Sequence, residues 1–313
     1  MYPTLKQKNI FHFTKNLPNG ITPISITWDQ GGHPAMISFS DGKVSQGSCV
    51  RCTNPPCIEY SAGELKLPVF RDFPADQNND VCTTSAITWS RESSSPGIDT
   101  SLCIQCGLCV GRCPVKAIYM DGEGAHLNDG PNVHFIEQKV LSNRAITDAY
   151  SKMFKSIPET GVYLAENDEL IIKFRQKFED VAKNQSAQFP NHLARNLLIQ
   201  NGIGAAMRRR GDTNIRMDLV LGPPGVRQGT SEVELGAEVL DAPRNILDNI
   251  AVLVARYELS KDSVVPIIVS LDLPNLRSEY WQFILDVRNV LGIKINSITI
   301  GALVLMSSVN FFL

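Results

Sequence analysis

The chain has little net charge. Lysines and arginines number 30 and aspartates and glutamates number 32, which leaves a formal charge of −2 at pH 7. Such a protein does not coat nucleic acid over its whole surface, so any DNA or RNA site must be a local patch. The N-terminus lacks a basic stretch followed by an apolar run, the pattern of a secretory signal. We therefore expect a cytoplasmic protein whose cysteines stay reduced.

Charge is also missing from the last 19 residues, Ile295 to Leu313. An uncharged run of this length is long enough to span a membrane. Six polar residues interrupt it: Asn296, Ser297, Thr299, Ser307, Ser308 and Asn310. We therefore expect a buried strand over residues 295–306 and no membrane association.

The sequence does contain eight cysteines, and four of them form one compact run. Cys103, Cys106, Cys109 and Cys113 follow the spacing C-x2-C-x2-C-x3-C, and Pro114 comes directly after. This spacing builds cubane iron–sulfur clusters. A zinc site uses paired C-x2-C knuckles and gains nothing from a third cysteine at the same interval. A disulfide framework is disfavoured because cysteines this close in sequence are poorly placed to bond each other.

The other four cysteines form a second, interrupted copy of the run. Cys49, Cys52 and Cys57 begin it, and the fourth thiol appears only at Cys82. The segment from Cys82 to Ile87 aligns with the segment from Cys113 to Ile118, except that Thr83 stands where the proline is expected. An insertion of roughly two dozen residues, rich in Pro, Asn and Asp, separates the third and fourth cysteines. Its composition predicts a surface loop.

With this pairing, residues 49–120 resemble the two-cluster [4Fe–4S] ferredoxin family. The first copy, with C-x2-C-x4-C and Pro55-Pro56, looks like the ferredoxin-type electron-transfer subunits of molybdopterin oxidoreductases. In the family, the fourth cysteine of each run completes the cluster of the other run. The resemblance thus implies one cluster on the first group of cysteines and one on the second: Cys49, Cys52, Cys57 and Cys113, then Cys82, Cys103, Cys106 and Cys109. The alternative leaves Cys82 as a free thiol, with Ser61 or water completing the site.

The last third of the chain has a different pattern. A helix is expected at 169–181, where apolar residues recur on one face. From residue 190 on, the pattern predicts the order α-β-β-α-β-α-β, typical of an α/β layer with a mixed sheet. The expected helices cover 191–209, 243–257 and 277–291, and the expected strands cover 214–221, 231–240, 264–271 and 295–306.

Three acidic residues stand on two strands that a hairpin would place side by side. Asp218 lies in an otherwise apolar strand, and Glu232 and Glu234 project to one face of the next strand by the period-two rule. Neighbouring strands lie about 5 Å apart, so the three carboxylates are expected to converge. Oxygen ligands at that density suit Mg2+ or Mn2+.

This arrangement resembles the PD-(D/E)xK nuclease superfamily. The resemblance implies Asp218 and Glu232 as metal ligands and catalytic residues, with Glu234 at the position of the signature lysine. A phosphate-binding patch is expected from Arg208, Arg209, Arg210 and Arg216, because guanidinium groups match phosphate geometry. The alternative is an edge hairpin whose solvent face carries ordinary acids, and a helix end that carries ordinary arginines.

The expected fold class is α+β or α/β, in four regions. They are a β-rich N-terminal segment (1–48), a two-cluster ferredoxin-like domain (49–135), a helical connector (136–189) and a restriction-endonuclease-like α/β domain with a mixed sheet (190–313). We expect two [4Fe–4S] clusters, and Mg2+ or Mn2+ for phosphodiester hydrolysis on DNA, as in restriction or defence. The alternative is an electron-transfer subunit whose C-terminal domain only docks a redox partner protein.

Overall fold

The computed structural model describes residues 22–25, 48–65, 73–115, 117–120, 123–129, 161–164, 169–222, 229–275 and 277–308. Three regions named above fall partly outside these residues: the N-terminal segment 1–48, the helical connector 136–189 and the end of the uncharged tail.

A seven-stranded mixed sheet forms the centre of the molecule, in the order β1-β6-β11-β10-β9-β8-β7. The first five of these strands are parallel, and β9, β8 and β7 are antiparallel neighbours. In that order the strands are Thr22–Ser25, Gly161–Leu164, Asn296–Thr299, Val265–Ser270, Gly229–Glu234, Leu219–Leu221 and Ala205–Met207. The mixed sheet expected from the sequence is therefore present.

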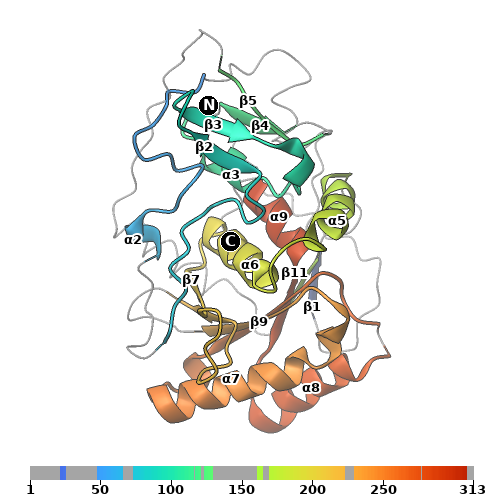
Figure 1. Cartoon of the computed structure of the whole chain (residues 1–313). Helices are drawn as coiled ribbons and strands as arrows, with labels where there is room; N and C mark the ends of the chain where they lie inside the picture. The colour runs from blue at the N-terminus through green and yellow to red at the C-terminus, as the bar shows by residue number, and fades with distance from the viewer. Residues whose placement is uncertain are drawn as a thin grey trace.

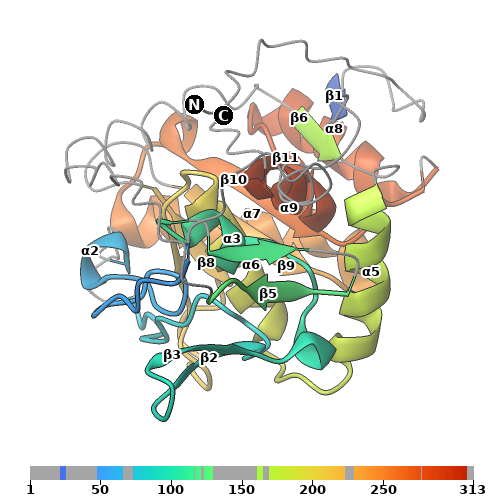
Figure 2. The same ribbon diagram turned by 90° about the horizontal axis from the view of Figure 1, so that it is seen from above.

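Helices cover both faces of the sheet (Figures 1 and 2). One face carries α5 (Glu169–Ala182), α6 (Phe189–Gln200) and α9 (Ile300–Ser308). The other carries α7 (Ala242–Tyr257) and α8 (Glu279–Leu291). Short 3-10 turns at Ala237–Leu240 and Lys261–Ser263 precede α7 and β10.

Strand β10 shows why the sheet needs both layers. Ile267 and Val269 join the core under α6 and α9, whereas Ile268 joins the core under α7 and α8. Successive side chains of a strand point to opposite faces, so an unbroken apolar run is stable only where both faces are covered.

The cysteine-bearing region consists of two short hairpins and two short helices. The hairpins pair β2 (Ile87–Ser90) with β3 (Ser95–Ile98) and β4 (Ile118–Met120) with β5 (Ala125–Leu127). The helices are α2 (Ala62–Leu65) and α3 (Leu108–Arg112), and a 3-10 turn spans Thr100–Leu102.

The internal repeat is visible in the hydrogen bonds of these hairpins. The Asp99 N–H donates to the Ala86 carbonyl at 2.7 Å, and the Asn128 N–H donates to the Ala117 carbonyl at 2.8 Å. Ala86 and Ala117 are the residues that the sequence alignment of the two copies pairs. The duplication therefore extends from the sequence to the backbone.

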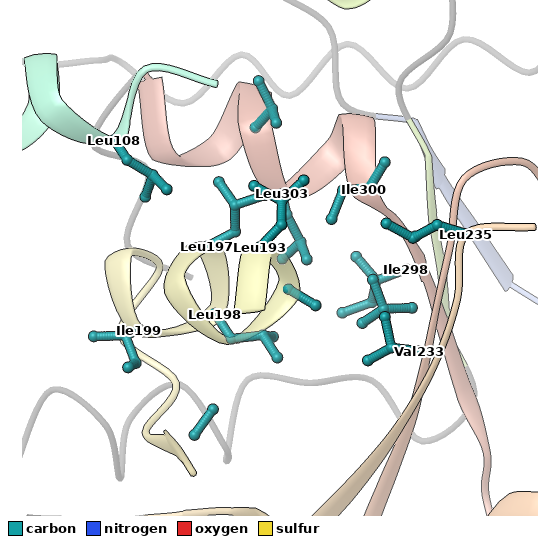
Figure 3. Close-up of a cluster of buried hydrophobic side chains, with 14 of the residues drawn as sticks. Leu108, Leu193, Leu197, Leu198, Ile199, Val233, Leu235, Ile298, Ile300 and Leu303 are labelled. Atoms are coloured by element: carbon teal, nitrogen blue, oxygen red, sulfur yellow. The ribbon is translucent and has the colours of Figure 1, made fainter. Parts of the chain in front are cut away.

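The cysteine region and the sheet share one hydrophobic core. Tyr60, Val81, Ile104 and Leu108 belong to the same buried cluster as the inner faces of α5, α6 and α9. Figure 3 shows Leu108 of α3 together with side chains of α6 and α9 in this cluster. Helix α3, which carries Cys109, is thus fixed directly to the α/β layer.

Two helix and strand predictions were wrong. The helix expected at 191–209 ends at Gln200, and residues Ala205–Met207 form β7. Gly202 has a φ of 85°, a left-handed conformation that favours glycine and ends the helix. The strand expected at 295–306 ends at Thr299, and α9 follows. A continuous apolar run has no period that separates a buried strand from a buried helix.

Two other expectations need correction. The described strand of the N-terminal segment, β1, is an edge of the central sheet and pairs with β6, which lies in the supposed helical connector. The insertion is also no simple surface loop, as shown below. No helix in the described ranges is long and apolar enough to cross a membrane.

Candidate iron–sulfur site

The eight cysteines come from three stretches of the chain. Cys49, Cys52 and Cys57 precede α2, and Cys82 ends the insertion just before β2. The second run follows the 3-10 turn: Cys103, Cys106, Cys109 within α3, and Cys113 as the C-cap of that helix.

Both C-x2-C loops contain the same unusual backbone conformation. Arg51, directly before Cys52, has a φ of 52°, and Gln105, directly before Cys106, has a φ of 59°. Non-glycine residues seldom adopt positive φ, and such residues collect at functional sites. The matching positions in the two copies point to loops shaped for the same purpose.

The first group of thiols surrounds Cys57. Burial raises the pKa of the Cys57 thiol to about 12, and the nearby thiols Cys113, Cys52 and Cys49 raise it further. Burial likewise raises the pKa of Cys52, again with Cys113 and Cys49 as neighbours. Cys113 therefore lies among the three cysteines of the other run.

The second group surrounds Cys109. Burial raises the pKa of the Cys109 thiol well above its usual value, and Cys103, Cys106 and Cys82 add to the effect. Burial also raises the pKa of Cys106, and Cys82 is the largest neighbouring contribution. Cys57 also acts on Cys109, so the two groups adjoin.

The second group lines a cavity enclosing about 370 Å³, part of which is open to solvent. All four of its cysteines line the wall, and most other wall residues are apolar. These apolar residues are Ala86, Ile87, Ile98, Ile104, Leu108, Met120 and Ala125. Buried thiolates so close together repel each other, and bound iron would compensate their charge.

Backbone N–H groups point at several of the sulfurs. The Ala117 N–H lies 3.1 Å from the Cys113 sulfur. Burial raises the pKa of Cys103, and the N–H groups of Gln105 and Ala125 oppose that rise. Such donors stabilise thiolates and tune the reduction potential of a cluster. The donor set and its hydrogen bonds thus fit a [4Fe–4S] cluster.

Comparison with known families agrees with this chemistry. Residues 96–119 match the family model described as a 4Fe-4S binding domain. The chain is an iron–sulfur protein. This matched segment holds the four cysteines of the second run and the whole of α3. No curated protein and no solved structure matches the iron–sulfur chain significantly.

Ser61, the alternative ligand to Cys82, is used elsewhere. Its hydroxyl donates to Glu64 Oε2 at 2.8 Å, and its N–H donates to the same oxygen at 2.8 Å. The Glu64 N–H in turn donates to the Ser61 hydroxyl at 3.3 Å. This reciprocal pattern is a capping box at the start of α2.

Arg112 ties the two cysteine runs together, and sequence analysis missed it. Its guanidinium lies 4.0 Å from the centre of the Tyr60 ring. Its Nε donates to the Pro56 carbonyl at 2.7 Å, and its Nη2 donates to Glu64 Oε1 at 2.8 Å. The Ser61–Glu64 capping box can be recognised from the sequence motif, but no local sequence signal indicates that Arg112 contacts Glu64.

The insertion between Cys57 and Cys82 is clamped onto helix α6. Arg195 Nη1 donates to the Asn78 carbonyl at 2.8 Å, and the His192 ring nitrogen Nε2 lies 3.1 Å from the Asp80 carbonyl oxygen. Because only an N–H can bond a carbonyl oxygen, His192 donates from Nε2. Burial lowers the pKa of His192 to about 4, and Arg195 adds to the effect. The described part of the insertion is thus a bracket anchored on α6, although Gln77, Asn78 and Asp80 lie at the surface as predicted.

The bracket also extends the central sheet. Ala75 forms an isolated antiparallel bridge with Arg208, and the Asp76 N–H donates to the Met207 carbonyl at 2.7 Å. The outer edge of β7 is therefore paired, and the same insertion connects that edge to Cys82.

Asp218 and Glu232 meet at the β8–β9 hairpin. Leu219 pairs with Ser231, so Asp218 and Glu232 are the next residues along the two strands. Burial raises the pKa of Asp218. Burial raises the pKa of Glu232 to about 8, with the Asp218 carboxylate as the next contribution.

The two carboxylates are held by amides from opposite layers. Asn191 of α6 donates to Asp218 Oδ1 at 2.9 Å, and the Val233 N–H donates to Asp218 Oδ2 at 3.1 Å. Asn249 of α7 donates to Glu232 Oε2 at 3.0 Å. Neither asparagine was found by sequence analysis, because their roles depend on how the helices pack.

The expected three-carboxylate metal site is not assembled. Within the described parts of the chain, no three His, Cys, Asp or Glu side chains lie close enough to hold a single metal ion. Asp218 instead bonds an amide of α6, and Glu232 bonds an amide of α7. This single-ion criterion does not apply to the ligands of a [4Fe–4S] cluster, because each thiolate binds its own iron and the four thiolates surround the cluster.

The expected arginine patch follows strand β7 instead of closing a helix. Arg208 Nη1 donates to the carbonyls of Asp212 and Ile215 at 3.3 and 3.1 Å, so it organises its own loop. The other three members of the patch are exposed: Arg209, Arg210 and Arg216.

Proposed function

We propose that the chain holds two [4Fe–4S] clusters, one on each group of four cysteines. Bound there, each cluster supplies one-electron chemistry. The proposal is carried by the way Cys113 and Cys82 exchange groups. Cys113 is an electrostatic neighbour of Cys52 and Cys57 in the first run, and Cys82 is a neighbour of all three cysteines that begin the second run. The matched 4Fe-4S segment covers only residues 96–119, so the second cluster depends on this geometry.

The two sites differ in their surroundings, although each has one buried and three half-buried cysteines. Arg51, beside the first site, is exposed. Cys106 of the second site packs against the core that this region shares with α5, α6 and α9. The second site is therefore the one in contact with the α/β layer.

Iron content tests the number of clusters. Anaerobically purified or reconstituted protein is expected to contain about eight irons and eight sulfides per chain, as two [4Fe–4S] clusters require. Cys82→Ala should remove or degrade one cluster and leave the other spectroscopically intact. Ser61→Ala is the matched control and should leave the iron content unchanged. A wild-type content of about four irons, or an unaltered cluster spectrum in Cys82→Ala, would refute the assignment.

A second candidate function is phosphodiester hydrolysis at Asp218 and Glu232. Two buried, mutually repelling carboxylates on adjacent strands are the observation that favours it, because perturbed acids of this kind collect at active sites. Mg2+ is commonly held by one or two carboxylates, with water and substrate phosphate completing its shell. Asp218 and Glu232 would hold such an ion, which would polarise a phosphodiester and activate water.

The chain's own residues would act around that ion. Glu232, with a pKa of about 8 in the metal-free protein, would release its proton on holding the ion. Asn191 and Asn249 orient the two carboxylates. The exposed Arg209, Arg210 and Arg216 offer cations to a phosphate backbone such as that of DNA.

Plasmid cleavage in Mg2+ or Mn2+ tests this second function, in both oxidised and reduced protein. Asp218→Asn and Glu232→Gln should each abolish cleavage, whereas Glu258→Gln, an exposed acid at the end of α7, should not. Absence of cleavage by the wild-type protein in every redox state would leave an electron-transfer protein whose C-terminal layer serves as a docking module.

A further inference from the structure

Two threonines distinguish the second cysteine site from the first. Thr83 and Thr84 follow Cys82 directly and line the same cavity as the four cysteines of that site. The Thr84 hydroxyl oxygen lies 3.5 Å from the Cys82 sulfur. The Thr83 hydroxyl is buried, and no hydrogen-bond partner for it is found among the described residues.

The first site has no such hydroxyls. In the other copy of the repeat, Pro114 and Val115 occupy the positions of Thr83 and Thr84. Proline and valine side chains carry no hydrogen-bond donor, and proline also lacks the backbone N–H. The two sites therefore differ in donors at equivalent positions of otherwise similar loops.

A buried hydroxyl without a partner is destabilising, so the Thr83 hydroxyl favours an acceptor in the cavity. Ile87, Ile104 and Met120 form part of the surrounding wall and offer no competing polar group. In such a low-dielectric setting a single donor acts strongly on a nearby charge. Four cysteines line the same cavity, so the hydrogen-bond acceptor available to the hydroxyl is a sulfur-rich, negatively charged group bound there.

We propose that the Thr83 and Thr84 hydroxyls donate hydrogen bonds to the sulfurs of the cluster bound at Cys82, Cys103, Cys106 and Cys109. Reduction adds one negative charge to a cluster, and donors stabilise that charge. The second cluster therefore has the higher reduction potential of the pair. An electron shared between the two clusters therefore settles on the second cluster. This inference rests on the proposed two-cluster assignment.

Redox titration followed by electron paramagnetic resonance tests the inference. Wild-type protein should show two reduction potentials. Thr83→Val and Thr84→Val should each decrease the equilibrium constant for reduction of the second cluster about tenfold. For a one-electron couple this lowers the higher potential by about 59 mV. The lower potential should stay unchanged. Thr→Ser at each position should restore the wild-type value, because serine keeps the hydroxyl.

Thr88→Val is the matched control, since Thr88 lies on the exposed face of β2 outside the cavity. It should shift neither potential. The reciprocal variant Val115→Thr, which adds a hydroxyl at the first site, should raise the lower potential. Unchanged potentials in both valine variants, or equal shifts of both clusters, would overturn the inference while about eight irons still upheld the two-cluster assignment. A content of about four irons would instead refute the two-cluster assignment on which the inference rests.

Discussion

The side-chain amide of Asn196 on helix α6 donates to the carbonyl of Val81, the residue directly before Cys82, at 2.9 Å. The same amide nitrogen donates to the Asp80 carbonyl at 2.9 Å. Asn196 is fully buried. One side chain of the α/β layer therefore fixes the backbone that presents a proposed cluster ligand.

Asn196→Ala should loosen that backbone and weaken the second cluster. The buried Val81 carbonyl would lose this donor, whereas the Asp80 carbonyl keeps the His192 ring N–H, so the free energy of unfolding is expected to fall by about 1–3 kcal/mol. Urea unfolding and iron content measure the two effects. Asn184→Ala, an exposed asparagine after α5, should change neither. Full iron content with unaltered spectra in Asn196→Ala would show that the clamp does not position Cys82.

The stability of the protein should fall as pH rises from about 4.5 to 8 because of Glu232. Burial and Asp218 raise its folded pKa to about 8, whereas the unfolded carboxyl ionises near 4.5. In this window the folded state keeps a proton that the unfolded state has lost. The free energy of unfolding should therefore decrease by about 1.4 kcal/mol per pH unit from this group.

Urea titrations at several pH values check this slope. Glu232→Gln cannot ionise and should flatten the curve. Glu279→Gln should leave the slope unchanged, because the Glu279 side chain is 88% exposed. Added Mg2+ should reduce the loss at high pH only if the carboxylates bind it. A wild-type curve that is level from pH 5 to 8 would contradict a raised Glu232 pKa.

Arg112→Lys should destabilise the link between the two cysteine runs although it keeps the charge. Lysine cannot bond the Pro56 carbonyl and Glu64 together while stacking on Tyr60. The Arg112 side chain is 9% exposed, and its loss is expected to lower the free energy of unfolding by about 1–3 kcal/mol. Arg91→Lys, at an exposed turn, serves as the control in the same urea unfolding assay. Equal stabilities of the two variants would argue against the link.

Gly229→Ala should disrupt the pairing of β9 with β10. A Cβ atom at this position would lie 2.3 Å from the backbone carbonyl oxygen of Val265, which cannot move without shifting the neighbouring strand. Overpacking of this kind typically costs about 1–3 kcal/mol or more. Gly236→Ala is the control, because nothing lies within 4 Å of its added Cβ. Thermal unfolding of both variants should separate them clearly, and matching midpoints would show that the strands adjust.

Local chemistry decided what could be predicted about the cysteines. The spacing of Cys103, Cys106 and Cys109 indicates iron–sulfur binding because one tight loop must supply three thiolates. The alignment of Cys82 with Cys113 predicted which thiols face each other, and the structure places each among the other run's cysteines. Helix α5 was likewise predicted from the sequence, because the spacing of apolar residues along an amphipathic helix is a local property.

Only the tertiary structure decided what lies between these parts. Thr299 ends a strand and Ile300 begins a helix within one apolar run. An unbroken apolar pattern fits a buried strand and a buried helix equally well, so the packing of α9 in the core beside α6 decides between them. The insertion became a bracket because Arg195 and Asn196, distant in sequence, bind its carbonyls. Asp218 and Glu232 became neighbours through the pairing of β8 with β9, and each carboxylate bonds an amide from a different helix layer. The sequence determined the proposed cysteine ligands, and long-range packing determined what surrounds them.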